Sequence, residues 1–209
     1  MTIPNPGSGV KDASEVDPSS VRIDSRDACA RLYGMATSSC SRQVPNRPSH
    51  HDAPFLEKED LWVSGEGRYH TYRIPSLLVT PAGSLLAFCE GRRHGRGDTG
   101  DIDLLARRST DGGVSWGPSR VVWNDGANTC GNPCPVADRD TGAIWLFMTH
   151  NLGTDSEKDL VLGASKGRRT VWTSTSRDDG RSWSRPRNLS AGLVPQSWRW
   201  VATGPGAGI

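Results

Sequence analysis

Ser109-Thr-Asp111-Gly-Gly113-Val-Ser-Trp116 is repeated 67 positions later as Ser176-Arg-Asp178-Asp-Gly180-Arg-Ser-Trp183. Both segments fit the pattern Ser-x-Asp-x-Gly-x-x-Trp, and four fixed residues at fixed offsets are not expected twice in 209 positions by chance. An internal repeat is considered before any other feature, because it indicates a repeat architecture.

Each copy has the chemistry of a tight turn between two strand-like runs. In such a turn Asp accepts a bond from the backbone two residues on, Gly supplies a positive φ angle, and Ser adds a hydroxyl bond. We expect the Trp to close the hairpin by covering one of its faces. The residues predicted to be structural in this way are Ser109, Asp111, Gly113, Trp116, Ser176, Asp178, Gly180 and Trp183.

The composition favours many short strands joined by turns. Hydrophobic residues make up 34% of the chain, beside 24 Gly and 14 Pro, and eight Trp against three Phe and three Tyr indicate that indole rings do much of the packing. A formal charge of +2 gives no sign of nucleic-acid binding. No apolar run approaches the roughly 18 residues of a transmembrane helix, and no signal peptide is recognisable at the N-terminus.

The five cysteines, at positions 29, 40, 89, 130 and 134, are an odd number. An odd number favours reduced cysteines over a disulfide framework. Cys130 and Cys134 have three residues between them and no second ligand pair nearby. We therefore expect ordinary loop or strand cysteines, no metal site and no cofactor.

The chain divides near residue 55. Residues 1–55 carry Gly, Ser, Pro, Asp and Arg with no sustained period, which predicts a disordered or irregular leader, with Met35 as an alternative start. From Leu61 strands alternate with turns. The expected strands are 69–80 (interrupted by Pro75), 84–90, 101–108, 120–123, 135–137, 143–149, 170–176 and 199–203. No stretch has a convincing helical period, although a helix is hardest to exclude over 155–162.

Strands and turns at intervals of about 8–12 residues are typical of an all-β fold. Combined with the repeat, they favour a β-propeller. The repeat interval exceeds the usual blade of about 40–50 residues, so loops must be inserted, chiefly over 151–169. Residues 56–209 are expected to form one domain with at most three or four blades. Because a propeller closes only when its last blade meets its first, we expect the N-terminal part of a larger protein.

Four further segments, together with the repeat, resemble the sialidase (neuraminidase) family, in which the repeat is called the Asp-box. They are Tyr72-Arg-Ile-Pro75, Phe88 to Ser109, Gly131-Asn-Pro-Cys-Pro-Val136 and Trp200-Val-Ala-Thr-Gly-Pro-Gly206. The resemblance covers residues 57–209, with the motifs in the family's order. It implies a six-bladed sialidase-type β-propeller, of which the first three or so blades are present here.

The same resemblance implies the activity of an exo-alpha-sialidase, a retaining glycoside hydrolase. Its substrates are sialylated glycoconjugates, that is, glycoproteins, glycolipids or oligosaccharides that end in sialic acid. Members of the family are often secreted, lysosomal or membrane-associated, so the resemblance leaves the compartment of this chain open.

By this resemblance, Arg73 belongs to a triad of arginines that binds the carboxylate of the substrate. Sialic acid is anionic near neutral pH, and a guanidinium is a rigid planar fork that pairs with a carboxylate through two parallel bonds. Taken alone, Arg73 is better explained as a surface arginine on an edge strand. The Asp-boxes downstream favour the functional interpretation.

The resemblance also makes Asp98 the general acid/base, Arg92 a ligand of a sugar-ring hydroxyl, and Glu90 a supporting carboxylate. A general acid has to lie near the leaving oxygen, and the glycines of the loop 95–100 can place and move such a group. The alternative for Asp98 is an ordinary solvated acidic loop.

Three more polar residues near these motifs leave alternatives open. Asp101 and Asp103 compete with Asp98 for the acid role, but they lie two residues apart in a strand and share a face, so we expect at least Asp103 to be structural. Asn132 matches a family position that lines the pocket, and it is explained nearly as well as a turn former before Pro133. The Gly-Pro-Gly sequence at 204–206 supports the match in order more than the chemistry.

The nucleophile of the family is a Tyr activated by a Glu, an exception to the scheme of two carboxylates. Tyr33, Tyr69 and Tyr72 do not match its position, so none is assigned, and we expect the Tyr–Glu pair and two further arginines in later blades. The chain alone is then expected to be inactive. The alternatives are a non-catalytic Asp-box propeller that binds glycans or proteins, and the product of a pseudogene. Arg73 followed by Asp98 favours the enzyme, because a purely binding propeller needs neither.

Overall fold

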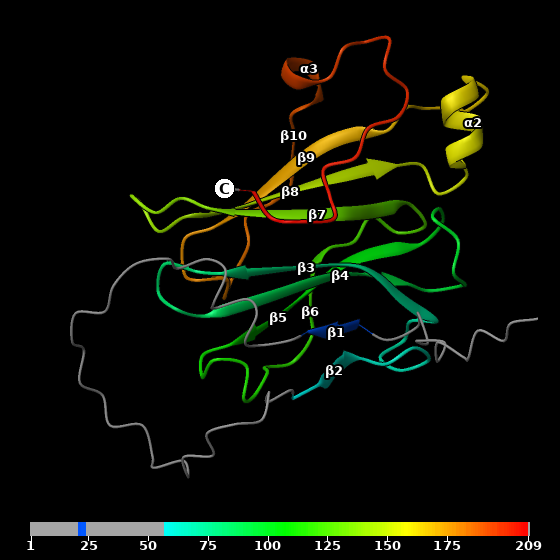
Figure 1. Cartoon of the computed structure of the whole chain (residues 1–209). Helices are drawn as coiled ribbons and strands as arrows, with labels where there is room; N and C mark the ends of the chain where they lie inside the picture. The colour runs from blue at the N-terminus through cyan, green and yellow to red at the C-terminus, as the bar shows by residue number, and fades with distance from the viewer. Residues whose placement is uncertain (1–20, 24–56, 209) are drawn as a thin grey trace, which may run out of the picture.

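The structure is a computed structural model that describes residues 21–23 and 57–208 (Figure 1). Its strands are β1 (Val21–Ile23), β2 (Glu59–Trp62), β3 (Thr71–Val79), β4 (Leu85–Arg92), β5 (Ile102–Ser109), β6 (Arg120–Trp123), β7 (Thr129–Ala137), β8 (Ile144–Asn151), β9 (Thr170–Ser176) and β10 (Arg187–Asn188). Its helices are α2 (Glu157–Leu162) and α3 (Ser190–Leu193).

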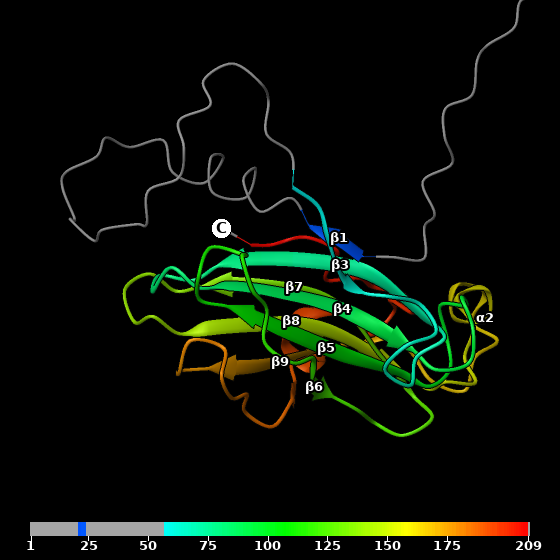
Figure 2. The same ribbon diagram turned by 90° about the horizontal axis from the view of Figure 1, so that it is seen from below.

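Strands β3 to β10 form two antiparallel units of four strands, which we call the first blade (β3–β6) and the second blade (β7–β10). Within each blade, strands that follow one another along the chain pair with one another. A single parallel pair, Ile102 with Thr129, connects the two blades. The result is an open sheet rather than a closed ring, with β7 lying beside β3 and β4 (Figures 1 and 2).

The expected strands are confirmed with one exception. Residues 199–203 form no strand, and the segment that they begin instead lies along the inner strand β7, with Gly208 N donating to Pro135 O at 2.9 Å. The expected third blade is therefore represented in the described residues only by this irregular segment. Strand β1 lies within the range expected to be a leader and pairs with β2; the rest of that range, including Cys29, Met35 and Cys40, lies outside the described residues.

Two helices correct the expectation that the chain has none. Helix α2 lies in the expected insertion 151–169, and its ends explain it: the Ser156 hydroxyl accepts a bond from Asp159 N, and Gly163 ends the helix with φ 72°. Both are standard helix caps. Only Leu160 of this helix is buried, so six residues give too little apolar periodicity to reveal it. Helix α3 is a single turn.

The inner strands β3 and β7 each contain a β-bulge, and in both strands it lies at a residue that is followed by Pro. In β3 the register shifts between Arg73 and Ser76, and Ile74 has φ 57°; in β7 it shifts between Gly131 and Cys134, and Asn132 has φ 53°. A left-handed residue followed by Pro thus makes a bulge at the same place in both blades. Bulges change the direction of side chains and are common beside functional sites.

The hydrophobic core follows the alternation of side chains along β4, every residue of which is buried. Leu86 and Phe88 face the second blade, where they join the main core. Ala87 and Cys89 face β2, in a second cluster with Trp62 and Tyr72. Successive residues of a strand point to opposite faces, so β4 is covered on one face by the second blade and on the other by β2.

The two Asp-boxes have the same hydrogen bonds. In the first, Gly113 N donates to Ser109 Oγ at 2.9 Å and Ser115 N to Asp111 Oδ1 at 2.9 Å. The corresponding bonds of the second box, to Ser176 and Asp178, are also 2.9 Å each. The glycines have positive φ, 88° and 79°, as expected.

Two details of the boxes differ from expectation. Each Asp accepts from the backbone N–H of the residue four positions on, not two, and in both boxes that residue is a second Ser. That Ser, Ser115 or Ser182, also donates its hydroxyl to the carboxylate. Trp183 covers more than its own hairpin: it packs edge-on against Phe88 of the first blade, with ring centroids 5.7 Å apart. The second box therefore helps to hold the blades together.

Asp179, also in the second box, links it to the first blade. Its carboxylate accepts from Thr80 Oγ1 at 2.5 Å and from Ser84 Oγ at 2.7 Å, and it pairs with the guanidinium of Arg108. Arg108 Nε also donates to Asp179 O at 2.7 Å. Burial opposes ionisation of Asp179, but the bonds from Thr80, Arg108 and Ser84 outweigh it and lower its pKa.

We predict that Asp179→Ala lowers the free energy of unfolding by about 2–3 kcal/mol, because it leaves the partly buried Arg108 without its carboxylate. Asp179→Asn, which keeps the shape and tolerates positive φ, should cost less. Chemical denaturation measures both, with the exposed turn variant Asp140→Ala as control. If Asp179→Ala changes stability no more than Asp140→Ala does, the link contributes nothing.

The Asp-boxes also predict how stability depends on pH. The hydroxyl and backbone N–H of Ser115, with the hydroxyl of Ser109, lower the pKa of Asp111 to about 2. Burial opposes ionisation of Asp178, but the bonds from Ser182 and Ser176 lower its pKa to about 2 as well.

A carboxyl whose pKa is lower in the folded state stabilises the fold fully above its unfolded pKa, near 3.8. That stabilisation is lost as the pH falls towards about 2. We predict that Asp178→Asn, which lacks this contribution, loses less unfolding free energy between about pH 5 and pH 2 than the parent does. Asp140→Asn is the control, and parallel curves for parent and Asp178→Asn would contradict the prediction.

Candidate active site

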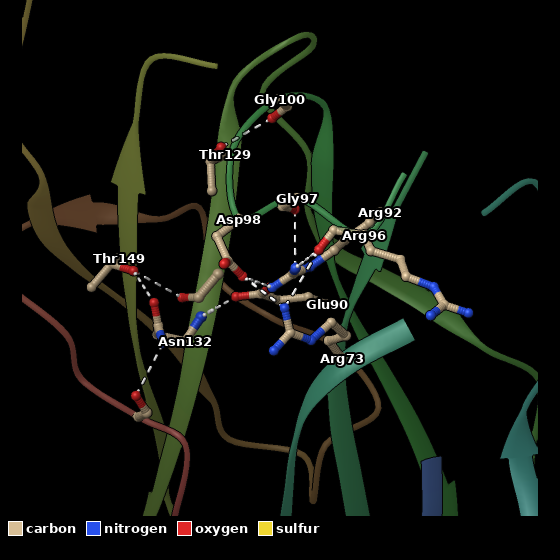
Figure 3. Close-up of polar contacts among 12 residues, drawn as sticks. Arg73, Glu90, Arg92, Arg96, Gly97, Asp98, Gly100, Thr129, Asn132 and Thr149 are labelled. Carbon is tan, nitrogen blue, oxygen red and sulfur yellow. Dashed lines mark hydrogen bonds and ion pairs between the residues drawn. The ribbon is translucent and has the colours of Figure 1, made fainter. Parts of the chain in front are cut away.

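Four of the predicted site residues meet at one end of the first blade (Figure 3). Arg73 extends from the bulge of β3, Glu90 and Arg92 end β4, and Asp98 lies in the loop that follows. Asp98 Oδ1 lies 3.0 Å from Arg73 Nη1 and 2.7 Å from Arg92 Nη2. We call these four residues the Arg73 cluster.

Exposure divides the cluster into an open part and a buried part. The side chains of Arg73 and Asp98 are 42% and 50% exposed. Those of Arg92 and Glu90 are 2% and 3% exposed. The accessible pair is therefore a cation and an anion that face each other above a buried ion pair.

All three guanidinium nitrogens of Arg92 donate hydrogen bonds to other groups of the protein. Nε and Nη2 donate to Glu90 Oε2, at 3.0 and 2.6 Å, and Nη2 also contacts Asp98. Nη1 donates to Arg96 O at 2.6 Å and to Gly97 O at 3.0 Å. These contacts favour a role in positioning the loop and Asp98, while the expected contact between Arg92 and a sugar hydroxyl stays a prediction.

The glycine-rich loop is held at both ends. Arg92 binds the carbonyls of Arg96 and Gly97 on one side of Asp98, and Thr129 Oγ1 donates to Gly100 O at 3.0 Å on the other (Figure 3). The loop was expected to place and to move its aspartate; these bonds account for the placing.

The buried carboxylate of Glu90 joins the blades. Its Oε1 accepts from Asn132 N of β7 at 2.9 Å, while Oε2 serves Arg92. A Cβ atom on the preceding Gly131 would lie 2.2 Å from Glu90 Oε1. Strands β4 and β7 can approach this closely only because position 131 has no side chain.

The amide side chain of Asn132 points away from Asp98 and into a second polar group. Its Oδ1 accepts from Thr149 Oγ1 at 3.0 Å (Figure 3). The same Oδ1 accepts from Arg169 Nη2, and Nδ2 donates to Gly204 O at 3.0 Å. Asn132 thus serves the cluster through its backbone and the neighbouring segments through its side chain. Both interpretations of this residue, pocket lining and turn former at a left-handed position, keep their support.

Arg169 is a residue that the sequence did not reveal. It is 3% exposed, donates from Nε to Thr149 Oγ1 at 3.0 Å, and stacks on the ring of Trp200 at 4.1 Å. Burial is the main cause of its lowered pKa, against the attraction of Glu90. Residues 168 and 169 are both Arg, and no local pattern distinguishes the buried one.

The rival acids lie in a separate group. Asp103 is fully buried and accepts from Tyr69 Oη at 2.6 Å and from Arg93 Nη2 at 2.8 Å. Asp101 pairs with Arg93 at 3.0 Å. The prediction that Asp103 is structural fits this geometry, and Asp98 is the aspartate that reaches Arg73.

In the described part of the chain Tyr69 and Tyr72 are buried, and their hydroxyls donate to Asp103 and to the backbone of Glu66, outside the Arg73 cluster. Burial, then the bond to Asp103, raises the pKa of Tyr69 well above its usual range. Burial raises the pKa of Tyr72 to about 12, and its hydroxyl donates to Glu66 O at 2.8 Å. Neither has the lowered pKa of an activated phenol, in keeping with leaving both unassigned; Tyr33 lies outside the described residues.

Among the residues that the structure describes, no group of three His, Cys, Asp or Glu side chains could hold a metal ion. In the same part of the chain, no helix is long and apolar enough to cross a membrane.

Antiparallel four-stranded blades that carry Asp-boxes define a class, the β-propeller built from repeats. The comparisons with known proteins are specific. The profile of the BNR repeat-like domain matches residues 83–209, more than half of the chain. The chain is therefore a member of the BNR repeat-like domain family. The relatives that it matches are sialidases.

The relatives found by comparison are all named as sialidases. The chain is 39% identical over 184 residues to an exo-alpha-sialidase of Aspergillus fumigatus, covering 78% of this chain and 45% of that protein. It is 38% identical to an exo-alpha-sialidase of Arthroderma benhamiae, covering 74% and 41%. A solved structure, the Hadza microbial sialidase Hz136, superposes with a TM-score of 0.64 at 30% identity, covering 70% and 31%. The chain thus spans less than half of the length of these relatives.

Gly131→Ala tests whether the close approach of β7 to β4 holds Glu90 in place. We predict a loss of about 1–3 kcal/mol in unfolding free energy, because the added methyl group displaces the buried carboxylate. Gly95→Ala is the matched control, since an added Cβ there has nothing within 4 Å. Denaturation curves compare the two variants. Equal stability would mean that Glu90 moves aside at no cost.

Proposed function

We propose that the chain is part of an exo-alpha-sialidase, which releases terminal sialic acid from glycoproteins, glycolipids or oligosaccharides. The observation that carries this proposal is the meeting of Arg73 and Asp98, two exposed and oppositely charged groups 3.0 Å apart. Membership of the family and the names of the relatives support it.

Binding begins with an exchange of partners at Arg73. The carboxylate of sialic acid takes the guanidinium through two parallel bonds, a geometry that suits Arg and that Lys lacks. Asp98 then loses one of its two cationic partners and keeps Arg92. The exchange places the sugar over the cluster and frees Asp98 to face the leaving oxygen.

Asp98 is the general acid/base of the proposed reaction. Because Arg92 and Thr129 hold the loop on both sides of it, its carboxyl is aimed before the substrate arrives. A catalytic group that is already held in its reactive orientation lowers the activation barrier, because less entropy is lost when the substrate binds. The retaining mechanism also requires the family's Tyr nucleophile with its Glu, and two further arginines.

In this proposal the two described blades belong to a six-bladed propeller. Each inner strand brings its left-handed residue and Pro to the same level, at Ile74 and Asn132, so further blades of this kind would place more side chains around one axis. The relatives are more than twice as long as the matched region, which leaves room for those blades. A purely binding propeller explains the fold as well, but not the Arg73–Asp98 pair or the names of the relatives.

Arg73→Lys tests the proposal. Titration of the chain with methyl sialoside, followed by ¹H–¹⁵N NMR, should give binding that this variant weakens by about tenfold or more, since Lys keeps the charge but loses the fork. Arg68→Lys, an exposed arginine outside the cluster, is the control. Binding that is the same in both variants would remove Arg73 from the site.

Asp98→Ala tests the acid role wherever hydrolysis is measurable. It should slow release of sialic acid from natural glycans more than from aryl sialosides, whose leaving group needs little protonation. Equal losses on both substrates would contradict that role.

A further inference from the structure

A cavity of about 400 Å³ lies between β6 of the first blade and the outer half of the second blade, from β8 to the turn before β10. We call it the tryptophan pocket. Strand β6 contributes to it from the first blade, and β8, β9 and the turn before β10 from the second. The residues that line it are Trp123, Asn124, Asp125, His150, Trp172, Arg185 and Pro186.

Three aromatic rings form one wall of the tryptophan pocket. The ring centroids of Trp123 and Trp172 are 4.9 Å apart, and His150 lies 5.2 Å from the first and 5.8 Å from the second. These distances leave no space between the rings. A ligand could therefore contact only the part of the aromatic surface that lines the cavity. Trp172 is fixed in place by a bond from its Nε1 to Thr170 Oγ1 at 2.9 Å.

Polar groups stand at the edge of this aromatic wall. Asp125 Oδ2 lies 2.7 Å from His150 Nε2 and accepts from Asn128 Nδ2 at 2.8 Å. The Asp125 side chain is nevertheless 48% exposed, while that of His150 is 15% exposed. The carboxylate is thus held in a fixed orientation and still reaches solvent, where it can accept further hydrogen bonds.

Strand pairing places the tryptophan pocket at the same end of the blades as the Arg73 cluster. Arg92 pairs with Ile102, Ile102 with Thr129, and Thr129 with Asn151, the neighbour of His150. Neighbouring strands lie about 4.8 Å apart, so three strand spacings separate the cluster from the pocket. The two sites therefore lie at the same end of the blades without sharing a residue.

We propose that the tryptophan pocket is a second carbohydrate site, which binds an uncharged pyranose ring. One face of such a ring carries C–H groups and packs on indole, while its hydroxyls need a few placed donors and acceptors at the edge. Asp125 supplies acceptors there and Arg185 supplies donors, while the amide of Asn124 is held by the buried Asp103.

The charge of Asp125 decides against an acidic sugar. The bond from Asn128 lowers the pKa of Asp125, against the effect of burial, and His150 lowers it further. The carboxylate is therefore ionised at neutral pH and repels a second carboxylate, whereas hydroxyls donate to it. The exposed Arg185 is solvated and offsets this repulsion only in part. Selectivity for neutral over anionic rings follows.

Titration of the full chain with methyl β-galactoside tests this proposal. The indole N–H signals of Trp123 and Trp172 should shift in ¹H–¹⁵N NMR spectra, with a dissociation constant on the order of 1 mM, as expected for one sugar ring. Glycerol, which has hydroxyls but no ring face, should leave them unchanged, and methyl sialoside should shift them less. No response of either indole to the galactoside would overturn the proposal.

Variants separate the tryptophan pocket from other sites. Asp125→Ala, at an exposed side chain, and Trp172→Ala should each weaken binding of the galactoside at least about tenfold. If Trp172→Ala unfolds the chain, Asp125→Ala and Arg185→Ala carry the test. Trp198→Ala, at a 55% exposed indole outside the pocket, and Asp98→Ala should bind as the parent does. Binding that survives Asp125→Ala but is lost in Asp98→Ala would assign the sugar to the Arg73 cluster instead.

Discussion

One buried carboxylate, that of Glu90, connects the fold to the site. A buried charge is tolerated only when it is paired and hydrogen-bonded, and Glu90 meets this condition with partners in both blades, Arg92 and the backbone of Asn132. The carboxylate of Glu90 can come this close to β7 only because residue 131 is Gly. Arg92, fixed by Glu90, in turn fixes the loop that carries Asp98. The packing of two blades thus determines where an exposed acid stands.

The same constraint explains why strain is found here. A left-handed φ at a β-branched residue such as Ile74 costs on the order of 1–3 kcal/mol, and such strain persists where the surroundings impose it. In β3 the bulge at Ile74 lies between Arg73 and Ser76; in β7 the equivalent bulge presents Asn132 N to Glu90. Both departures from regular strand geometry serve contacts at the cluster. A polar link between Asp179, in the turn after β9, and Arg108, near the end of β5, joins the two blades at their opposite end.

Local patterns predicted the local features. The Asp-boxes, seven of the eight expected strands and the grouping of Arg73 with Asp98 all follow from residues close in sequence, or from motifs in a known order. Features that depend on distant partners were missed: Asp179 reaches Thr80 across 99 positions, and Arg169 reaches Asn132 across 37. Helix α2 was missed because its signal is a pair of caps around six residues. The strand expected at 199–203 lacks a pairing partner in the described residues.

The central claim is that Arg73 exchanges Asp98 for the carboxylate of a sugar. A crystal structure of the chain with bound sialic acid tests it most directly. The account predicts both carboxylate oxygens of the ligand within hydrogen-bond distance of the Arg73 guanidinium, with Asp98 no longer in contact with Arg73 but still paired with Arg92. Sialic acid bound elsewhere, above an intact Arg73–Asp98 pair, would contradict it.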